Sequence, residues 1–453
     1  MKTFLKRILI YVLCITILFS FSGCSSPIGV EELAYVIAIG LDSADDDTIE
    51  LTLQFATAGS GDSSGSSMQS TKTNVSSVKC TTIDSGITLI NSHISKKINL
   101  SHCKEIIISE ELAKKGVEDY LDTFINNTEL TNDAEMIISK CKAKEYIENV
   151  NPVFEGLLSK YYTATQKTDT YTAYSTSMNL ATFYCLLKDT YYQPYATIGT
   201  ISKKSNGDDS QSDKSESKSS NSSEDSEESS KSSSESSPSD MNSGSDSESG
   251  DTSTVPTQNS VNANFMAGEY EFDDKNPIQI IGFAAFNNDK LVGEFTGLDS
   301  ICFSIINNEF EESILSIPSP FEENKYIDLS ITSNKKTKCR VDLSQTNPLI
   351  QVNVYLTGFG QSMDKQTSYS NEESIQKIKQ SAEIYMKQNI ESFLNKTSKE
   401  YNSDICGFGR FAVKHYLTME QWEDSHWLDN YKNCTFDVNV LFNITAGNVF
   451  SET

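Results

Sequence analysis

The sequence predicts an α+β protein of several small mixed domains with antiparallel sheets, one long helix in the C-terminal part, and a disordered linker between two halves. Three observations lead to this prediction. The chain has 453 residues, of which 37% are hydrophobic, which is more than one ordinary core needs and enough for two or three. Short segments of alternating apolar residues recur among segments with helical spacing. A Ser-rich acidic stretch lies at the middle of the chain.

The N-terminus, residues 1–23, has the plan of a secretory signal peptide. Basic residues precede an apolar run at 8–19, which is too short for a hydrocarbon core that needs roughly 20 helical residues. Residues 21–24, Phe-Ser-Gly-Cys, resemble a lipobox, in which the Cys24 thiol takes a diacylglycerol. Two acyl chains suffice for stable anchoring. We expect diacylglycerol and an N-acyl chain on Cys24 and no other cofactor; an uncleaved anchor and an ordinary signal peptide with an incidental cysteine are the alternatives.

The charge balance excludes some partners. Acidic residues outnumber Lys and Arg by 63 to 37, and the formal net charge is −26. Such a chain repels nucleic acid and anionic lipid headgroups at long range. We therefore expect no nucleic-acid partner, and we expect the lipid rather than electrostatic attraction to hold the protein at a membrane.

Catalytic and metal-binding patterns are weak. Residues 61–65 match G-x-S-x-G, but they lack the strand before and the helix after that a nucleophile elbow requires. The four histidines show no ligand spacing, so we expect neither a catalytic site nor a metal. Eight cysteines remain beyond Cys24, none in a C-x-x-C pair, so scattered buried thiols are favoured over disulfides, which stay open. They are Cys80, Cys103, Cys141, Cys185, Cys302, Cys339, Cys406 and Cys434.

An N-terminal α+β domain is predicted over residues 24–201. Its helices carry apolar stripes of 3.6-residue period, and Glu110 and Glu111 open the second helix favourably for the helix dipole. Its strands are recognised either as a continuous apolar run or by the alternation of apolar and polar residues. In chain order the elements are a buried strand at 34–39, an alternating strand at 49–55, a helix at 83–94, a strand at 106–108 and a helix over 110–125.

The linker is predicted at 202–262. It is rich in Ser and acidic residues and almost free of large apolar ones, so it cannot bury enough surface to offset the entropy of ordering. A second flexible stretch is predicted at 59–70. We expect the linker to be a passive spacer, because lengthening a flexible tether costs only about 0.6 kcal/mol per doubling.

A C-terminal α+β region is predicted over 263–453. A polar turn joins two strands into a hairpin. Alternation of apolar and polar residues indicates further strands that bury one face against a helix. A long segment with helical periodicity indicates that helix. In chain order the elements are a hairpin at 278–295, strands at 327–331 and 350–356, a helix at about 371–401, and a final strand at 436–446.

Five segments in this order resemble the C subunits of bacterial spore germinant receptors, the Ger(x)C lipoprotein family. The resemblance starts at Cys24, covers most of the chain, and includes a long helix that ends in DICGFG. Phe21 in the lipobox, the 59–70 insertion and the long linker depart from the family pattern. The segments that carry the resemblance are ELAYVIAIGLD at 32–42, SHCKEIIISEELAKKGVEDYL at 101–121, IIGFAAFNNDKLVGEF at 280–295, DICGFG at 404–409, and VNVLFNITAG at 438–447 with Trp427 and Tyr431 before it.

The resemblance implies a non-enzymatic lipoprotein on the outer face of the spore inner membrane. Its partners would be the A and B integral membrane subunits of the receptor, and its role would lie in assembly or coupling for nutrient-triggered germination. Binding of a small molecule by this subunit itself stays open. The main alternative is a lipid-anchored solute-binding protein of an importer, which predicts two lobes of alternating parallel strands and helices. A lipoprotein enzyme of the cell envelope is a third reading, for which we find no catalytic constellation.

A docking surface for the partner subunits is our hypothesis for the hairpin at 280–295 and the segment at 404–416. Glycines at the ends of predicted elements prompt it, although glycines that only satisfy turns explain the same pattern. The candidate partner-binding residues are Gly282, Lys290, Gly293, Gly407 and Gly409.

Overall fold

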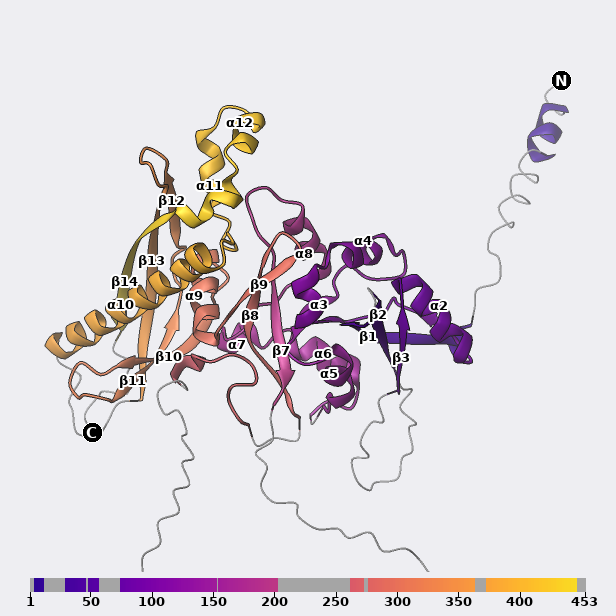
Figure 1. Cartoon of the computed structure of the whole chain (residues 1–453), viewed down its shortest axis with the longest axis horizontal. Helices are drawn as coiled ribbons and strands as arrows, with labels where there is room; N and C mark the ends of the chain where they lie inside the picture. The colour runs from indigo at the N-terminus through magenta and orange to yellow at the C-terminus, as the bar shows by residue number, and fades with distance from the viewer. Residues whose placement is uncertain are drawn as a thin grey trace, which may run out of the picture.

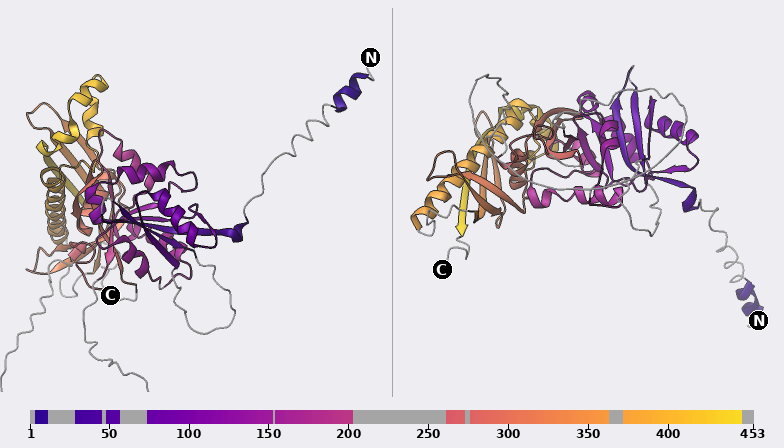
Figure 2. Two further views of the ribbon diagram at one scale, coloured as in Figure 1. Left: turned by 45° about the vertical axis from the view of Figure 1, so that its right-hand side comes forward. Right: turned by 90° about the horizontal axis from the view of Figure 1, so that it is seen from below.

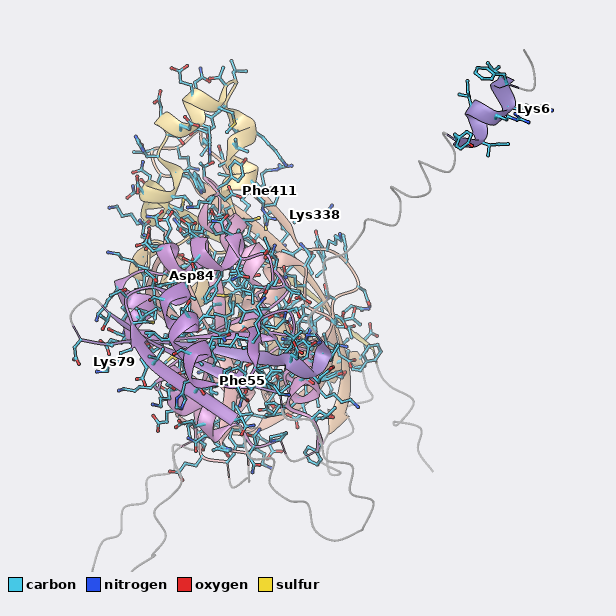
Figure 3. The ribbon with its side chains drawn as sticks, turned by 90° about the vertical axis from the view of Figure 1, so that its right-hand side faces the viewer. Lys6, Phe55, Lys79, Asp84, Lys338 and Phe411 are labelled. Carbon is cyan, nitrogen blue, oxygen red and sulfur yellow. The ribbon has the colours of Figure 1, made fainter. Side chains whose placement is uncertain are left out.

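The computed structural model describes residues 4–11, 29–45, 48–56, 74–152, 154–202, 261–272, 276–362 and 372–445. Cys24, most of the apolar run before it, the G-x-S-x-G match, the stretch at 59–70 and the linker from 203 to 260 lie outside these residues. Residues 4–11 form a helix, carrying Lys6, that lies apart from the body of the molecule (Figure 1, Figure 3). Within the described ranges, no helix combines the length and apolarity needed to cross a membrane.

Two β-sheets lie side by side and form the body of the molecule (Figure 1). The first has nine strands in the order β3-β2-β1-β5-β6-β7-β8-β9, with β4 paired to β1. Its strands are β1 (Leu33–Ser43), β2 (Ile49–Phe55), β3 (Asn74–Cys80), β4 (Lys97–Asn99), β5 (Glu105–Ser109), β6 (Glu135–Ser139), β7 (Tyr195–Ile201), β8 (Ile278–Asn287) and β9 (Lys290–Phe295). The second has five strands in the order β10-β11-β13-β12, with β14 paired to β13. These are β10 (Glu312–Pro318), β11 (Tyr326–Thr332), β12 (Lys338–Asp342), β13 (Leu349–Ser362) and β14 (Thr435–Thr445).

The centre of the first sheet is parallel, and its edges are antiparallel. β1, β5, β6 and β7 run parallel to one another, which requires helical crossovers between them. Every residue of β5 and of β6 is buried, as expected for parallel strands covered on both faces. The helices of this part are α2 (Ile83–His93), α3 (Glu110–Lys115), α4 (Glu118–Asn126), α5 (Ala143–Asn149), α6 (Leu158–Thr165), α7 (Asp169–Thr172) and α8 (Leu180–Leu187).

The hairpin β8–β9 completes the first sheet, although it follows the linker in the chain. β8 pairs antiparallel with β7, and the Ser202 amide donates a hydrogen bond to the Pro277 carbonyl at 2.6 Å. Without β8, the edge of β7 would expose a row of unpaired backbone groups. The sheets therefore do not follow the division that the sequence predicts, because the 263–453 region contributes two strands to the sheet of the 24–201 domain.

The second sheet is covered by the long helix α10 (Glu372–Asn395), which runs along one face (Figure 1, Figure 2). Its buried face includes Ile378, Ala382, Met386 and Ile390, spaced one turn apart. β11 alternates buried and half-exposed residues, as predicted. The other C-terminal helices are α9 (Gly297–Asn307), a π-helical turn (Lys396–Glu400), α11 (Gly409–Ala412), α12 (Met419–Asp424) and α13 (Trp427–Asn430).

One hydrophobic core extends from the first sheet into the second. Aromatic rings fill the space where the two sheets meet. Phe283 of β8 stacks on Phe295 of β9 with ring centroids 4.7 Å apart, and Phe295 contacts Phe393 of α10 edge to face at 5.1 Å. Phe303 of α9 lies 4.9 Å from Phe283. The hairpin, at the edge of the first sheet, therefore packs against α9 and α10, and the two parts share this core.

The α+β class is confirmed, with three differences in detail. The sheets are mixed rather than antiparallel, since β14 also runs parallel to β13. The helix predicted over 110–125 is two helices, because Gly116 adopts φ +133°, a conformation that ends a helix and that side chains rarely tolerate. The helix predicted at about 371–401 ends as α10 at Asn395 and continues as the π-helical turn.

Candidate functional site

The hairpin at 280–295 is in direct contact with the two residues that come just before the 404–416 segment. The Ser403 hydroxyl donates a hydrogen bond to the Phe286 carbonyl at 2.5 Å, and the Asn287 side-chain amide donates to the Asn402 carbonyl at 3.1 Å. We call this contact region the joint and define it as residues 191–193, 286–295 and 401–409. The joint connects the hairpin of the first sheet with the chain that follows α10.

A third segment of the chain completes the joint. Gln193 precedes β7, and its side-chain oxygen accepts a hydrogen bond from the Asn288 amide at 2.7 Å. The Gln193 amide donates to the Asp404 carbonyl at 3.1 Å. Gln193 is buried, so these bonds form away from solvent. Three segments far apart in sequence are thus held together by backbone and amide hydrogen bonds.

The carboxylate of Asp404 is the polar centre of the joint. It is fully buried. Its Oδ2 accepts from the Trp427 indole at 2.8 Å and from the Gly409 amide at 2.9 Å, and its Oδ1 accepts from the Phe408 amide at 2.9 Å. Burial raises the pKa of Asp404 to about 6, while the three hydrogen bonds and the charge of Arg410 oppose that rise. With three donors on one carboxylate, the group anchors the start of α11.

Close packing explains the two glycines of the 404–409 segment. Gly407 has φ +65°, and a Cβ there would collide with the Tyr192 ring. A Cβ on Gly409 would lie 2.7 Å from the backbone oxygen of Tyr191. Both glycines are buried. They are needed because the chain runs against the two tyrosines of the same molecule.

The glycines of the hairpin have a similar explanation. Gly282 is buried with φ +83°, and a Cβ there would collide with the Phe295 carbonyl. A Cβ on Gly293, which is half-buried, would collide with the Tyr401 ring. The hypothesis of a docking surface therefore needs correction at Gly282, Gly407 and Gly409, because these residues lie inside the molecule. Lys290 is exposed at the start of β9 and stays a predicted partner contact.

Two buried glutamates, which the sequence analysis does not single out, form a second polar site. Glu105 opens β5 and Glu135 opens β6, and the two residues pair directly in the parallel register. Their side chains therefore lie on the same face of the sheet, on strands about 4.8 Å apart. The available signal was a charged residue at the head of two isoleucine-rich strands, EIIIS and EMIIS.

The eight cysteines beyond Cys24 are free thiols, and five of them are buried. This arrangement agrees with scattered buried thiols rather than disulfides. Burial raises the pKa of Cys434 to about 12, for example, so this thiol stays protonated near neutral pH. In the part of the chain that the structure describes, no three His, Cys, Asp or Glu side chains are grouped to hold a metal ion.

The fold defines a class of α+β protein in which the N-terminal and C-terminal halves share one sheet and meet at one joint. Two family models match this chain. The model of the spore germination protein N-terminal domain matches residues 28–201, and the model described as spore germination B3/GerAC like, C-terminal, matches residues 281–447. Together they cover well over half of the chain, which therefore belongs to the GerAC-like family of spore germination proteins.

Individual relatives match over shorter stretches. Spore germination protein KC of Bacillus subtilis (strain 168) is 25% identical over 153 residues, which cover 33% of this chain and 38% of that protein. Spore germination protein GerQC of Bacillus cereus is 18% identical over 174 residues, or 38% of this chain and 47% of that protein. The chain thus aligns with less than half of the length of these relatives. The crystal structure of the GerBC protein aligns with 90% of this chain and 96% of its own, at 13% identity and a TM-score of 0.43.

Proposed function

We propose that the chain is the C subunit of a spore germinant receptor and acts with the A and B integral membrane subunits in nutrient-triggered germination. The observation that carries the proposal is the match of both family models, in order, on one chain. In this proposal the subunit catalyses no reaction. Its role is assembly of the receptor or coupling between the subunits, on the outer face of the spore inner membrane.

The proposed anchor is the diacylglycerol and N-acyl chain on Cys24. The formal net charge of −26 disfavours electrostatic attachment to anionic lipid, whereas two or more acyl chains hold a protein at a bilayer stably. Anchoring also raises the effective concentration at which the body meets partners in the plane of the membrane. A weak contact surface, including the exposed Lys290, then suffices for assembly. The joint supports a coupling role, because its hydrogen bonds connect the two parts of the subunit directly.

The anchor is tested by a single substitution. Cys24→Ser should release the protein from the membrane pellet of fractionated spores into the soluble fraction, and it should remove label incorporated from a radioactive fatty acid. Cys185→Ser is the matched control, because Cys185 is an exposed free thiol, and this variant should stay in the pellet with its label. A Cys24→Ser protein that remains membrane-bound and labelled would overturn the proposed anchor.

The partners are tested by affinity purification of the tagged protein from detergent-solubilised spore membranes. We expect two polytopic membrane proteins, one of them transporter-like, to be recovered with it. Recovery of a permease and an ATPase would replace the proposal with the alternative, a solute-binding protein of an importer. Repeating the purification with Lys290→Glu tests the predicted contact, and unchanged recovery of both subunits would exclude Lys290 from it.

A further inference from the structure

The two buried glutamates line a cavity at the head of β5 and β6. This cavity, which we call the inner cavity, has a volume of about 10 Å³, about the smallest that holds one water molecule. It shares four lining residues, Asp169, Ser175, Thr176 and Ser177, with a larger cavity of about 310 Å³. We call the two cavities together the acidic pocket.

The two glutamates are held very differently within the acidic pocket. Glu135 is fixed, since it accepts hydrogen bonds from the Ser177 hydroxyl at 3.1 Å and from the Met178 amide. Glu105 is only 1% exposed, and its Oε1 has one long contact, 3.5 Å from the Thr165 hydroxyl. That hydroxyl also lies 3.0 Å from the Tyr162 carbonyl, so its single proton cannot serve both. The protein's own donors thus hold the Glu135 carboxyl group in place. The Glu105 carboxyl group can still accept a hydrogen bond from another donor.

Two polar atoms that line the inner cavity have no hydrogen-bond partner. They are Oε2 of Glu105 and Oγ1 of Thr176, both buried. A buried carboxyl oxygen without a donor destabilises the folded state, and a second carboxyl beside it on the next strand adds repulsion. Burial and the charge of Glu135 raise the pKa of Glu105 well above its usual value. The Glu105 oxygen Oε2 therefore receives no hydrogen bond, and a positively charged donor would satisfy it best.

The walls of both cavities have one sign of charge. Four carboxyl side chains line them, and none of the lining residues is Lys, Arg or His. Besides the two glutamates, these carboxyls belong to Asp169 and Glu309. The charge of Arg410 acts on Glu309 from outside the lining. Hydroxyl groups of Ser and Thr residues supply most of the other polar surface, so acceptors for a cation predominate.

We propose that the acidic pocket binds the ammonium group of a small primary amine. An ammonium group matches the inner cavity in size, and its three N–H groups are donors only. They would meet Oε2 of Glu105 and Oγ1 of Thr176, forming charge-assisted hydrogen bonds. The larger cavity lies within the size range of small-molecule sites and would hold the carbon skeleton of the amine. This inference does not depend on the proposed function, because it stands on the geometry of the pocket alone.

The test is calorimetric titration of the full-length protein in non-ionic detergent. The probe is n-butylammonium chloride, with n-butanol as the uncharged analogue, tetramethylammonium chloride as a cation without N–H donors, and potassium chloride at equal ionic strength. We expect saturable binding of butylammonium alone. Absence of butylammonium binding would overturn the proposal and leave the two glutamates as a pair that shares a proton. Equal binding of tetramethylammonium or potassium would overturn the ammonium specificity.

Substitutions assign the binding to the pocket. Glu105→Gln keeps the shape of the side chain and removes its charge, so this variant should fold and its Kd for butylammonium should rise about tenfold or more. Glu145→Gln is the matched control on the exposed face of α5 and should leave the Kd unchanged. Thr176→Val provides a second variant, which should weaken binding about fivefold. Unchanged affinity in both pocket variants would show that the amine binds elsewhere.

Discussion

The joint holds the buried carboxyl group of Asp404 and the acidic pocket that of Glu105, and the two groups differ in their hydrogen bonds. Asp404 in the joint accepts three hydrogen bonds at 2.8 to 2.9 Å. Glu105 in the acidic pocket keeps one oxygen without any donor. Both groups are out of contact with solvent, so burial alone does not distinguish them. The number of donors that the protein itself provides is the difference.

This difference separates a structural carboxylate from one that is available to a ligand. A buried acceptor that the chain satisfies completely holds segments together and has no bond left to offer. A buried acceptor that the chain leaves open stores unfavourable free energy that a donor from outside can relieve. The joint therefore holds segments of the chain together, and the acidic pocket is the place where we expect another molecule to bind.

The largest effect is expected in the joint at Gly407. In Gly407→Ala, a left-handed conformation with a Cβ costs about 1–2 kcal/mol, and crowding against Tyr192 costs about 1–3 kcal/mol more. Urea unfolding should show a loss of about 4 kcal/mol in the free energy of unfolding. Gly156→Ala is the control, since no atom lies within 4 Å of its Cβ position. Equal stability of the two variants would mean that the joint is loosely packed.

Removal of the Asp404 carboxylate should have the next largest effect. Asp404→Ala leaves the Trp427 indole and two backbone amides without an acceptor, at about 1 kcal/mol or more each, so the expected loss is about 3 kcal/mol. Asp437→Ala, on the exposed side of β14, should cost less than about 0.5 kcal/mol. A small loss at Asp404, similar to that at Asp437, would remove the distinction between the joint and the acidic pocket.

The acidic pocket should make stability depend on pH through Glu135. Burial raises the pKa of Glu135 to about 7, above its ordinary value of 4.5. Because the folded state binds the proton more tightly, Glu135 stabilises the fold at low pH, and this stability is lost as the pH rises through 7. The contribution should fall by about 2 kcal/mol between pH 5 and pH 7. In Glu135→Gln this part of the pH dependence should disappear, whereas Glu145→Gln should follow the wild-type curve.

The smallest effect is expected from shortening the linker. Deletion of residues 205–255 should change the free energy of unfolding by no more than about 1 kcal/mol, because the closure entropy of a loop varies slowly with its length. The joint and the β7–β8 pairing, rather than the connecting chain, hold the two parts together. The deleted protein should also remain membrane-anchored. Loss of stable protein would show that the linker itself stabilises the fold.

Local patterns predicted about half of the elements, but β6, β7 and the short helices α5 to α9 were not among them. Local patterns also could not predict which elements pair. Alternation located β11 and β13, and the 3.6-residue period located the start of α10 but not its end at Asn395. Both signals depend only on near neighbours in the chain. The pairing of β7 with β8 was missed because it crosses the linker. Glu105 and Glu135 are thirty residues apart in sequence and become neighbours only through the parallel register. The positions of the glycines at 407 and 409 were recognised, but their partners, Tyr191 and Tyr192, belong to another segment.

The completion of the first sheet by β8 and β9 also sets an order of events during synthesis. The chain is synthesised from its N-terminus, so β7 is made before the linker and the hairpin. The free edge of β7 stays unpaired until β8 has also been synthesised. Contacts of such long sequence separation form slowly, and an open strand edge in an incomplete chain invites pairing with another copy. The protein thus depends most on protection from aggregation in the interval between the appearance of β7 and that of β9.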